Sequence, residues 1–284
     1  MLGAKSRNLD IALLLEAIYG SRGYDFRQYS RVSIIRRINS FMAKYSIRSP
    51  ADITRLVRRD TAFFNLLVSE ISVTVTEMFR HPATFRLLRE RVLPELTDKP
   101  RLKIWSAGCA TGEETYSLAI LLHEAGLLQR SQIYATDINP VTLQTAAKGM
   151  LPLHKLKHYT GNYYRSGGQR EFCSYYTVRH NIATMERFLT KQIQFTVHNL
   201  VNDRAFGDMD IIFCHNVLIY FTPDLQQRVI ALFLDSLKDN GFLSLGEKEH
   251  LSVNGHEQKF DSIAANEKLY RKKTLQGAKD YAVW

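Results

Sequence analysis

A loop of small residues stands where binding chemistry is expected. Residues 107–112 read AGCATG, follow a short apolar run and precede a helical pattern. Small side chains let a ligand approach the backbone, and glycine adopts dihedral angles that other residues avoid. The glycine spacing is GxxxG, which is neither the GxGxxG of dinucleotide-binding folds nor the GxxxxGKS/T of triphosphate-binding loops. The loop therefore indicates a nucleoside ligand without a triphosphate or, as the alternative, only a tight strand–helix turn.

An acidic residue beyond the loop narrows the choice of ligand. Asp137 ends the apolar run at 132–136. A carboxylate at the end of the second strand of an α/β sheet can accept hydrogen bonds from both hydroxyls of a ribose. Capping of the helix that begins at Pro140 is the structural alternative, but Asn139 is better placed for that cap. Loop and acid together predict a site for S-adenosylmethionine (SAM).

The small-residue loop and Asp137 need a β-sheet to position them, and the second part of the chain has the sequence pattern of an α/β sheet. After Pro100, apolar runs alternate with helical patterns, which is typical of a parallel sheet covered on both faces. Residues from about 150 to 195 interrupt this rhythm and indicate an inserted, mostly antiparallel subdomain. The expected fold is α/β, a Rossmann-like doubly wound sheet with the ligand beyond the carboxyl ends of its strands. We expect strands at 102–106, 132–136, 210–214 and 241–245, and helices at 115–124, 140–148 and 223–237.

The first part of the chain is expected to be an all-helical domain. Apolar residues within 1–90 recur at helical spacing, and Ser49 followed by Pro50 is a typical helix start. The segment 91–100 contains two prolines and mixed charge, so we expect it to be a linker. The α/β domain then spans 101–284.

Composition limits the class of protein and its partners. The formal net charge is +10, and residues 1–60 hold 12 Lys+Arg against 5 Asp+Glu. An acidic partner is consistent with this excess, as is a solvated basic helix face. No apolar run is long enough to span a bilayer, and no export leader opens the sequence. We expect a cytoplasmic protein without membrane insertion, and a monomer.

The cysteines and histidines give no sign of a metal site. The three cysteines are widely spaced and odd in number, which argues against a disulfide framework. His154 and His158 share an i, i+4 spacing, but no third ligand accompanies them. We therefore expect no metal ion and a reducing compartment.

Four motifs in order along the chain carry more specific information. They are VTVTEMFRHP at 73–82, SAGCATGEETYSLA at 106–119, IFCHNVLIYF at 212–221 and GFLSLGEKEH at 241–250. In this order they resemble the TxxFFR segment, the cofactor loop, the FCRNVxIYF segment and the GxLxxGHSE strand of the chemotaxis receptor methyltransferases, the CheR family. The resemblance extends from about residue 10 to 271, and four ordered motifs are far more specific than the loop alone.

The resemblance implies an activity and the residues that serve it. It implies a SAM-dependent methyltransferase with an all-α N-terminal domain, whose second product is S-adenosylhomocysteine (SAH). The acceptors would be glutamate side chains on the cytoplasmic signalling helices of methyl-accepting chemotaxis receptors, and the products methyl esters. Arg80 and Tyr220 would lie at the reaction site. The residues that the resemblance places around the cofactor are Thr74, Thr76, Arg80, Gly108, Glu114, Asp137, Asn199, Leu200, His215 and Asn216.

The sequence departs from the family pattern at several positions. Thr74 replaces an asparagine and keeps a hydroxyl, and His215 replaces an arginine, which makes the charge at this position depend on pH. Residues 246–249 read GEKE where the family has GHSE, and fewer arginines follow residues 36–37 in the basic N-terminal stripe. These departures leave open, as an alternative, a non-catalytic SAM-binding signalling module.

A nucleic-acid methyltransferase is a second alternative, because the chain is basic. Enzymes that act on base amines often carry an Asn/Asp-Pro-Pro-aromatic segment after the fourth strand, where this sequence reads HNVL at 215–218. The Pro-Cys nucleophile of pyrimidine-carbon methyltransferases is also absent from the sequence, and we expect Cys214 to be a buried strand residue. We therefore expect no nucleic acid as partner.

Overall fold

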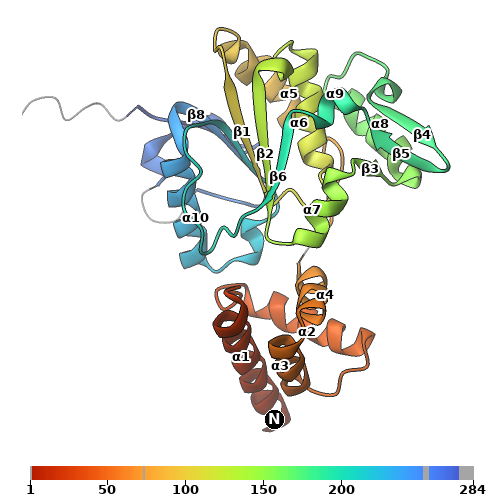
Figure 1. Ribbon diagram of the computed structural model, residues 1–284. Coiled ribbons are helices and arrows are strands. Elements are labelled where there is room, and N and C mark those ends of the chain that lie inside the picture. Colours follow the sequence, from red (N-terminus) through yellow and green to blue (C-terminus); the bar gives the residue numbers. More distant parts are fainter. Residues whose placement is uncertain (1, 73, 252–255, 275–284) are drawn as a thin grey trace, which may run out of the picture.

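The N-terminal part of the chain is helical (Figure 1). The computed structural model describes residues 2–72, 74–251 and 256–274. Ser49 caps α3 through its side chain, as expected, and Pro50 begins this helix. None of the helices in the described part of the chain is long and apolar enough to cross a membrane. The four N-terminal helices are α1 (Leu2–Arg22), α2 (Arg31–Lys44), α3 (Pro50–Arg59) and α4 (Thr61–Ile71), and they enclose a hydrophobic core of their own.

A seven-stranded sheet forms the centre of the second part of the chain. Its strands are β1 (Leu102–Ala107), β2 (Ser131–Asp137), β6 (Ile193–Val197), β7 (Met209–Cys214), β8 (Leu237–Leu245), β9 (Phe260–Ala264) and β10 (Leu269–Lys272). They lie in the order β6-β2-β1-β7-β8-β10-β9, with the first five parallel and β10 antiparallel to β8 and β9. The doubly wound α/β fold expected from the sequence is confirmed. The connections diverge between β1 and β7, so a ligand crevice is expected at the carboxyl ends of these strands.

Helices cover both faces of this sheet (Figure 1). Successive residues of β1 face opposite sides of the sheet. Ile104 packs in the core that includes α5 and α6, and Trp105 packs in the core that includes α10. Both faces of the central parallel strands β1, β2, β7 and β8 are apolar, which explains why their sequences contain nearly continuous apolar runs. The covering helices are α5 (Pro82–Leu87), α6 (Glu113–Glu124), α7 (Pro140–Ala147) and α10 (Pro223–Ser236).

A small antiparallel subdomain is inserted after α7, as the sequence predicts. Its sheet has the order β3-β5-β4 and is accompanied by two short helices. The insert ends earlier than the expected residue 195, because β6 begins at Ile193 and pairs with β2 at the edge of the main sheet. The elements of the insert are β3 (Met150–Leu151), α8 (Leu156–Arg165), β4 (Tyr176–Arg179), β5 (Ile182–Met185) and α9 (Arg187–Thr190).

The structure differs from the sequence prediction at residues 91–100, which we expected to be a linker. Leu88–Val92 form a π-helix and Leu93–Leu96 a 3₁₀-helix that continue α5, and the apolar side chains of this stretch are buried in a core of the sheet. The first of the two prolines lies at the start of the 3₁₀-helix, where the pattern of backbone hydrogen bonds changes from that of the π-helix. We propose that the two domains instead meet between α4 and α5.

The N-terminal helices dock on the loop that follows β7. Ser30 N donates a hydrogen bond to Tyr220 O at 2.7 Å, and Thr222 N donates one to Gln28 O at 2.9 Å. Tyr29 and Phe221 form an antiparallel bridge between these two bonds. The start of α2 is therefore held close to the carboxyl ends of β1 and β7.

Candidate active site

A cavity of about 320 Å³ lies between the sheet and the N-terminal helices. Small-molecule sites enclose roughly 300–1,000 Å³. Thr74, which the sequence analysis placed in the site, is half-buried and does not line this cavity. The predicted residues that do line it are Thr76, Arg80, Gly108, Glu114, Asp137, Asn199, Leu200, His215, Asn216 and Tyr220. The fold therefore brings residues as far apart in the sequence as Thr76 and Tyr220 to one cavity.

The small-residue loop packs against the turn that follows β7. Gly108 has a φ of +75°, in the left-handed region, and a Cβ atom at this position would overlap the side chain of Val217. The N–H groups of Gly108 and Cys109 both donate to Thr136 O, at 2.8 and 2.9 Å. Glycine meets both the dihedral and the steric requirement, so the backbone itself forms this wall of the cavity.

Asp137 joins the end of β2 to this loop. One carboxylate oxygen accepts a hydrogen bond from Ala110 N at 3.0 Å, and the other accepts one from Asn139 N at 2.9 Å. Burial raises the pKa of Asp137, while these backbone donors act in the opposite direction. A carboxylate has about four acceptor positions, so two remain for a ligand. Asn139 caps α7, as expected, which leaves Asp137 free for this role.

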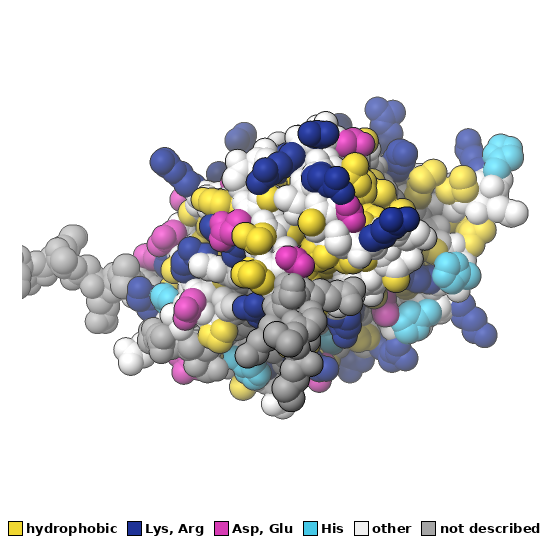
Figure 2. Space-filling model, turned by 90° about the horizontal axis from the view of Figure 1, so that it is seen from below, with side chains coloured by type: hydrophobic (Ala, Val, Ile, Leu, Met, Phe, Trp, Pro, Cys, Tyr) yellow, Lys and Arg dark blue, Asp and Glu magenta, His cyan; other side chains and the backbone are white. Residues whose placement is uncertain are grey.

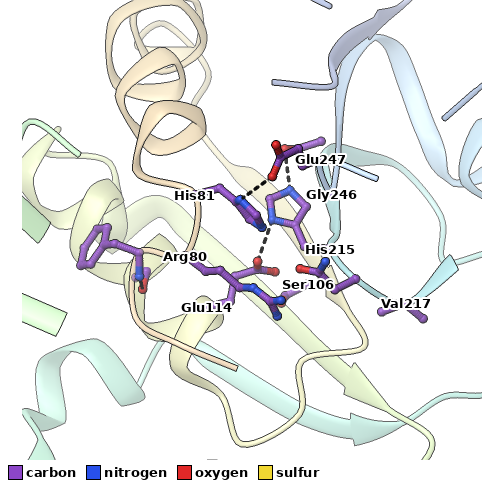
Figure 3. Close-up of polar contacts among 12 residues, drawn as sticks. Arg80, His81, Ser106, Glu114, His215, Val217, Gly246 and Glu247 are labelled. Atoms are coloured by element: carbon purple, nitrogen blue, oxygen red, sulfur yellow. Dashed lines mark hydrogen bonds and ion pairs between the residues drawn. The ribbon is translucent and has the colours of Figure 1, made fainter. Parts of the chain in front are cut away.

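His215 and Glu114 form a buried ion pair at the wall of the cavity. Figure 3 shows His215 between Glu114 and the turn at Gly246 and Glu247, with His81 beside it. His215 Nδ1 lies 2.8 Å from a Glu114 carboxylate oxygen, and His215 Nε2 lies 2.8 Å from Ser244 Oγ. Burial acts to lower the pKa of His215, but the charge of Glu114 and its contact with the ring outweigh this, and the pKa is raised. A raised pKa favours the protonated imidazole, whose positive charge lies beside the carboxylate of Glu114.

Glu249 holds the turn after β7 in place, and sequence reasoning missed this role. One of its carboxylate oxygens accepts hydrogen bonds from Val217 N at 2.8 Å and Leu218 N at 2.7 Å. The other accepts from Asn216 N at 3.0 Å and Gly246 N at 2.6 Å. The sequence signal was present, because this glutamate is the one residue after the glycine that the GEKE segment shares with the GHSE of the resembling family.

Two family models match this chain, one on each side of residue 73. The model described as "CheR methyltransferase, all-alpha domain" matches residues 9–72, and the one described as "CheR methyltransferase, SAM binding domain" matches residues 74–269. The chain belongs to the CheR methyltransferase family. Its cofactor is therefore S-adenosyl-L-methionine, and its activity is SAM-dependent methyl transfer.

Similar proteins match most of the length of this CheR methyltransferase. A Pseudomonas putida protein named "Putative methyltransferase Cher3" is 40% identical over 272 residues, which are 96% of this chain and 100% of that protein. A "Chemotaxis protein methyltransferase" of Vibrio anguillarum is 30% identical, with 90% of this chain and 93% of that protein covered. One of the same name from Listeria innocua is 29% identical, with 81% and 85% covered.

The residues around the cavity fit the chemical groups of SAM. Asp137 can accept hydrogen bonds from the ribose hydroxyls, and Leu200 offers an apolar surface to the adenine. Glu114 and Arg80 carry the charges that suit the amino and carboxylate groups of the methionine part. Asn216 Oδ1 is buried and has no hydrogen-bond partner among the described residues, so a ligand donor would satisfy it.

The N-terminal domain contributes cavity residues that sequence reasoning did not place in the site. They lie on the segment before α2, on α2 itself and at the end of α4, and each lies far along the chain from the cofactor loop. A local motif could not identify them, because docking of the helical domain brings them to the cavity. The residues in question are Tyr29, Ser33, Ile34, Arg37, Ile71 and Ser72.

Neither the cysteines nor the histidines form a metal site in the described part of the chain, where no group of three His, Cys, Asp or Glu is arranged to hold an ion. His158 Nε2 lies 2.9 Å from a Glu77 carboxylate oxygen. Cys214 is buried in β7, as expected.

The raised pKa of His215 predicts a pH-dependent stability. A raised folded pKa means that the stabilisation by His215 is complete below the unfolded value of about 6.5 and is lost as the pH rises through the folded value. The charged groups that face the ring are Glu114, Glu249 and Arg80, with His81 beside it. Urea unfolding from pH 6 to 9 should therefore show the difference between wild type and His215→Gln shrinking as the pH rises.

His81 provides a control, because its effect on stability should change with pH in the opposite direction to that of His215. The pKa of His81 is lowered, chiefly by burial and then by the charges of His215 and Arg80, so its contribution is lost as the pH falls. The difference between wild type and His81→Gln should therefore be constant from pH 7 to 9 and shrink as the pH falls below about 6.5. A wild-type advantage over His215→Gln that stays constant from pH 6 to 9 would contradict the protonated pair.

Proposed function

We propose that this CheR methyltransferase methylates glutamate side-chain carboxylates on the cytoplasmic signalling helices of methyl-accepting chemotaxis receptors, giving glutamyl methyl esters. The observation that carries this proposal is the single cavity shared by the cofactor loop, Asp137, Arg80 and Tyr220. Relatives named "Chemotaxis protein methyltransferase" support the choice of acceptor. We further propose that Arg80 and Tyr220 act at the reaction site.

A carboxylate acceptor fits a cavity that contains arginine. Glutamate has a reference pKa of about 4.3, so it is already ionised at neutral pH and needs no general base. When bound, SAM supplies a methyl group activated by the positive sulfonium sulfur. The carboxylate oxygen forms a bond to the methyl carbon as the carbon–sulfur bond breaks, and the bonding pair remains on sulfur. The protein's task is to align these three atoms and to exclude water.

The surface of the N-terminal helices suits an acidic partner. Figure 2 shows this end of the molecule, where Lys and Arg side chains spread among hydrophobic ones. Opposite charges on the two partners accelerate their encounter and are screened by salt. We therefore expect the KM for a receptor fragment to rise with ionic strength. Exposed arginines of α2 and α3 include Arg31, Arg36, Arg55, Arg58 and Arg59.

Transfer of labelled methyl groups from SAM tests the proposal. Receptor signalling fragments with glutamate at the candidate positions should gain label that alkali releases as methanol, whereas fragments with glutamine there should gain none. Mass spectrometry should locate one added methyl group on the glutamate. Tight SAH binding without label on any receptor fragment would instead support a non-catalytic module, and label in RNA or DNA would support the nucleic-acid alternative.

A further inference from the structure

The segment that carries Arg80 has a strained backbone. Phe79 and His81, on either side of Arg80, have φ values of +50° and +59°, in the left-handed region. A residue with a Cβ atom adopts this region at a cost in free energy, which other contacts must offset. Strain of this kind persists only where the surrounding structure holds the backbone, and it is frequent at functional sites. The contacts of this segment therefore decide where the Arg80 side chain begins.

Helix α8 of the inserted subdomain holds one side of the segment. Asn162 is 3% exposed, and its Nδ2 donates a hydrogen bond to Met78 O at 3.0 Å. Its Oδ1 accepts a hydrogen bond from Arg165, so both ends of the amide are used. His158, one turn earlier on α8, contacts Glu77 in a more exposed position. The bond to Met78 is shielded from water, so its loss would deprive a buried carbonyl of its donor.

Helix α6 holds the other side of the segment. Phe79 N donates a hydrogen bond to Ser117 Oγ at 2.8 Å, and this hydroxyl donates in turn to Glu113 O at 2.8 Å. The Phe79 ring is fully buried, and its centroid lies 5.3 Å from that of Tyr163 on α8. Phe79 is therefore fixed by its main chain and by its side chain, directly before Arg80 in the sequence.

The Arg80 side chain enters the cavity from this held segment. It lines the cavity with Thr76 and Glu114, and its Nη1 donates to Val75 O at 3.3 Å. Figure 3 shows Arg80 and Glu114 in the same part of the site. A displacement of about 1 Å at a reaction site can lower the rate about 100-fold. The guanidinium lies at the end of a long side chain, so a movement of the backbone at residues 78–80 displaces it.

We propose that Asn162 is a positioning residue for Arg80, and that the inserted subdomain thereby helps to set the geometry of the active site. The bond from Asn162 to Met78 O keeps the strained turn in the conformation that presents the Arg80 guanidinium to the cavity. Asn162 does not line the cavity, so it acts through Arg80 and not on a ligand. The inference rests on the place that the proposed function gives to Arg80 at the reaction site.

The first test observes Arg80 without turnover. In SAH-loaded protein labelled with ¹⁵N-arginine, the Arg80 Nε signal is assigned by its loss in Arg80→Gln. Asn162→Leu removes the donor but keeps a side chain of similar size, and it should move this signal. Ser117→Ala removes the acceptor of Phe79 N and should move it as well, so the test does not depend on the folding of one variant. An unchanged Arg80 signal in the folded variants would overturn the inference.

Ser166→Ala is the matched control for Asn162→Leu. Ser166 is buried at the C-cap of α8 and donates a hydrogen bond to Tyr163 O at 2.6 Å. Its replacement disturbs the same helix without removing a contact of residues 77–81. The Arg80 signal should therefore stay in place, and kcat/KM should change less than about twofold. Effects as large as those of Asn162→Leu would show that Asn162 has no specific role and would overturn the inference.

A double-mutant cycle with Arg80 separates positioning from a general loss of structure. The step that Arg80→Gln impairs, SAH binding or methyl transfer to a receptor fragment, should also be impaired about 10- to 100-fold by Asn162→Leu. In the Arg80→Gln background the same substitution should change that step less than about twofold, because no guanidinium is left to displace. Equal effects of Asn162→Leu in the two backgrounds would overturn the inference.

The outcomes distinguish this inference from the proposed function. Equal effects in both backgrounds, in a protein that methylates receptor glutamates, would overturn the role of Asn162 and leave the proposed function intact. A displaced Arg80 signal in Asn162→Leu, in a protein that methylates no receptor fragment, would overturn the proposed function and leave the positioning of Arg80 by Asn162 in place.

Discussion

Replacement of Asp137 by alanine is expected to weaken SAH binding by on the order of 100-fold or more. The substitution removes the acceptors proposed for the ribose, and hydrogen bonds to a charged group contribute about 1.5–3 kcal/mol each. It also removes the acceptor for Ala110 N, so the backbone of the loop loses its link to β2. Calorimetric titration with SAH measures the loss directly. Asp137→Ala with wild-type affinity would remove Asp137 from the cofactor site.

A matched variant separates the ligand role of Asp137 from its structural role. Asn139→Ala removes the cap of α7, at a cost of about 1 kcal/mol in stability, without touching an acceptor proposed for the ribose. It should therefore lower the midpoint of thermal unfolding while the Kd for SAH stays within a few-fold of wild type. If Asn139→Ala weakens SAH binding as much as Asp137→Ala does, both residues act through the fold and not through the ligand.

Replacement of Glu249 by glutamine is expected to lower the free energy of unfolding by about 2–6 kcal/mol. Each oxygen of Glu249 accepts two backbone N–H groups, so an amide nitrogen in either position leaves two buried donors without an acceptor. Each such donor costs about 1–3 kcal/mol. The loosened turn carries Asn216 and abuts Gly108, so SAH binding should weaken as well. Urea unfolding and calorimetry measure the two effects.

Glu247 is the natural control for Glu249, since it lies in the same segment. Its side chain is 70% exposed, and its ion-pair contact with His81 spans 3.7 Å. Glu247→Gln should therefore change the stability by less than about 0.5 kcal/mol. Equal effects of the two substitutions would mean that the turn does not depend on the four hydrogen bonds of Glu249.

The sequence predicted elements whose causes are local. The parallel strands β1, β2, β7 and β8 read as apolar runs because both faces of each are buried. The cap at Ser49 follows from the chemistry of one residue and its near neighbours. Strand β6 overlaps the range expected for the insert, because its alternating sequence IQFTV indicates a strand but only its pairing with β2 places it at the edge of the main sheet.

The prediction of a linker at residues 91–100 was based on their prolines and mixed charge. A surface loop and a helical turn with one buried face can both have this composition. Packing against the sheet decides which of the two conformations the segment adopts. Val92, Leu93 and Leu96 are buried because the sheet offers them an apolar surface. The place where the chain passes from one domain to the other is a property of packing, and composition does not report it.

The sequence by itself determined the cofactor side of this protein. Three features can be recognised from the sequence: the glycine at position 108, the acid at the end of β2 and the order of the four motifs. Together they predicted SAM as the cofactor. Only the tertiary structure decided what faces the cofactor from across the cavity. Arg37 and Tyr220 are brought together by docking of two domains, and Glu249 reaches the turn at 216–218 from the segment that follows β8. Such contacts depend on which surfaces meet, and no local pattern encodes them.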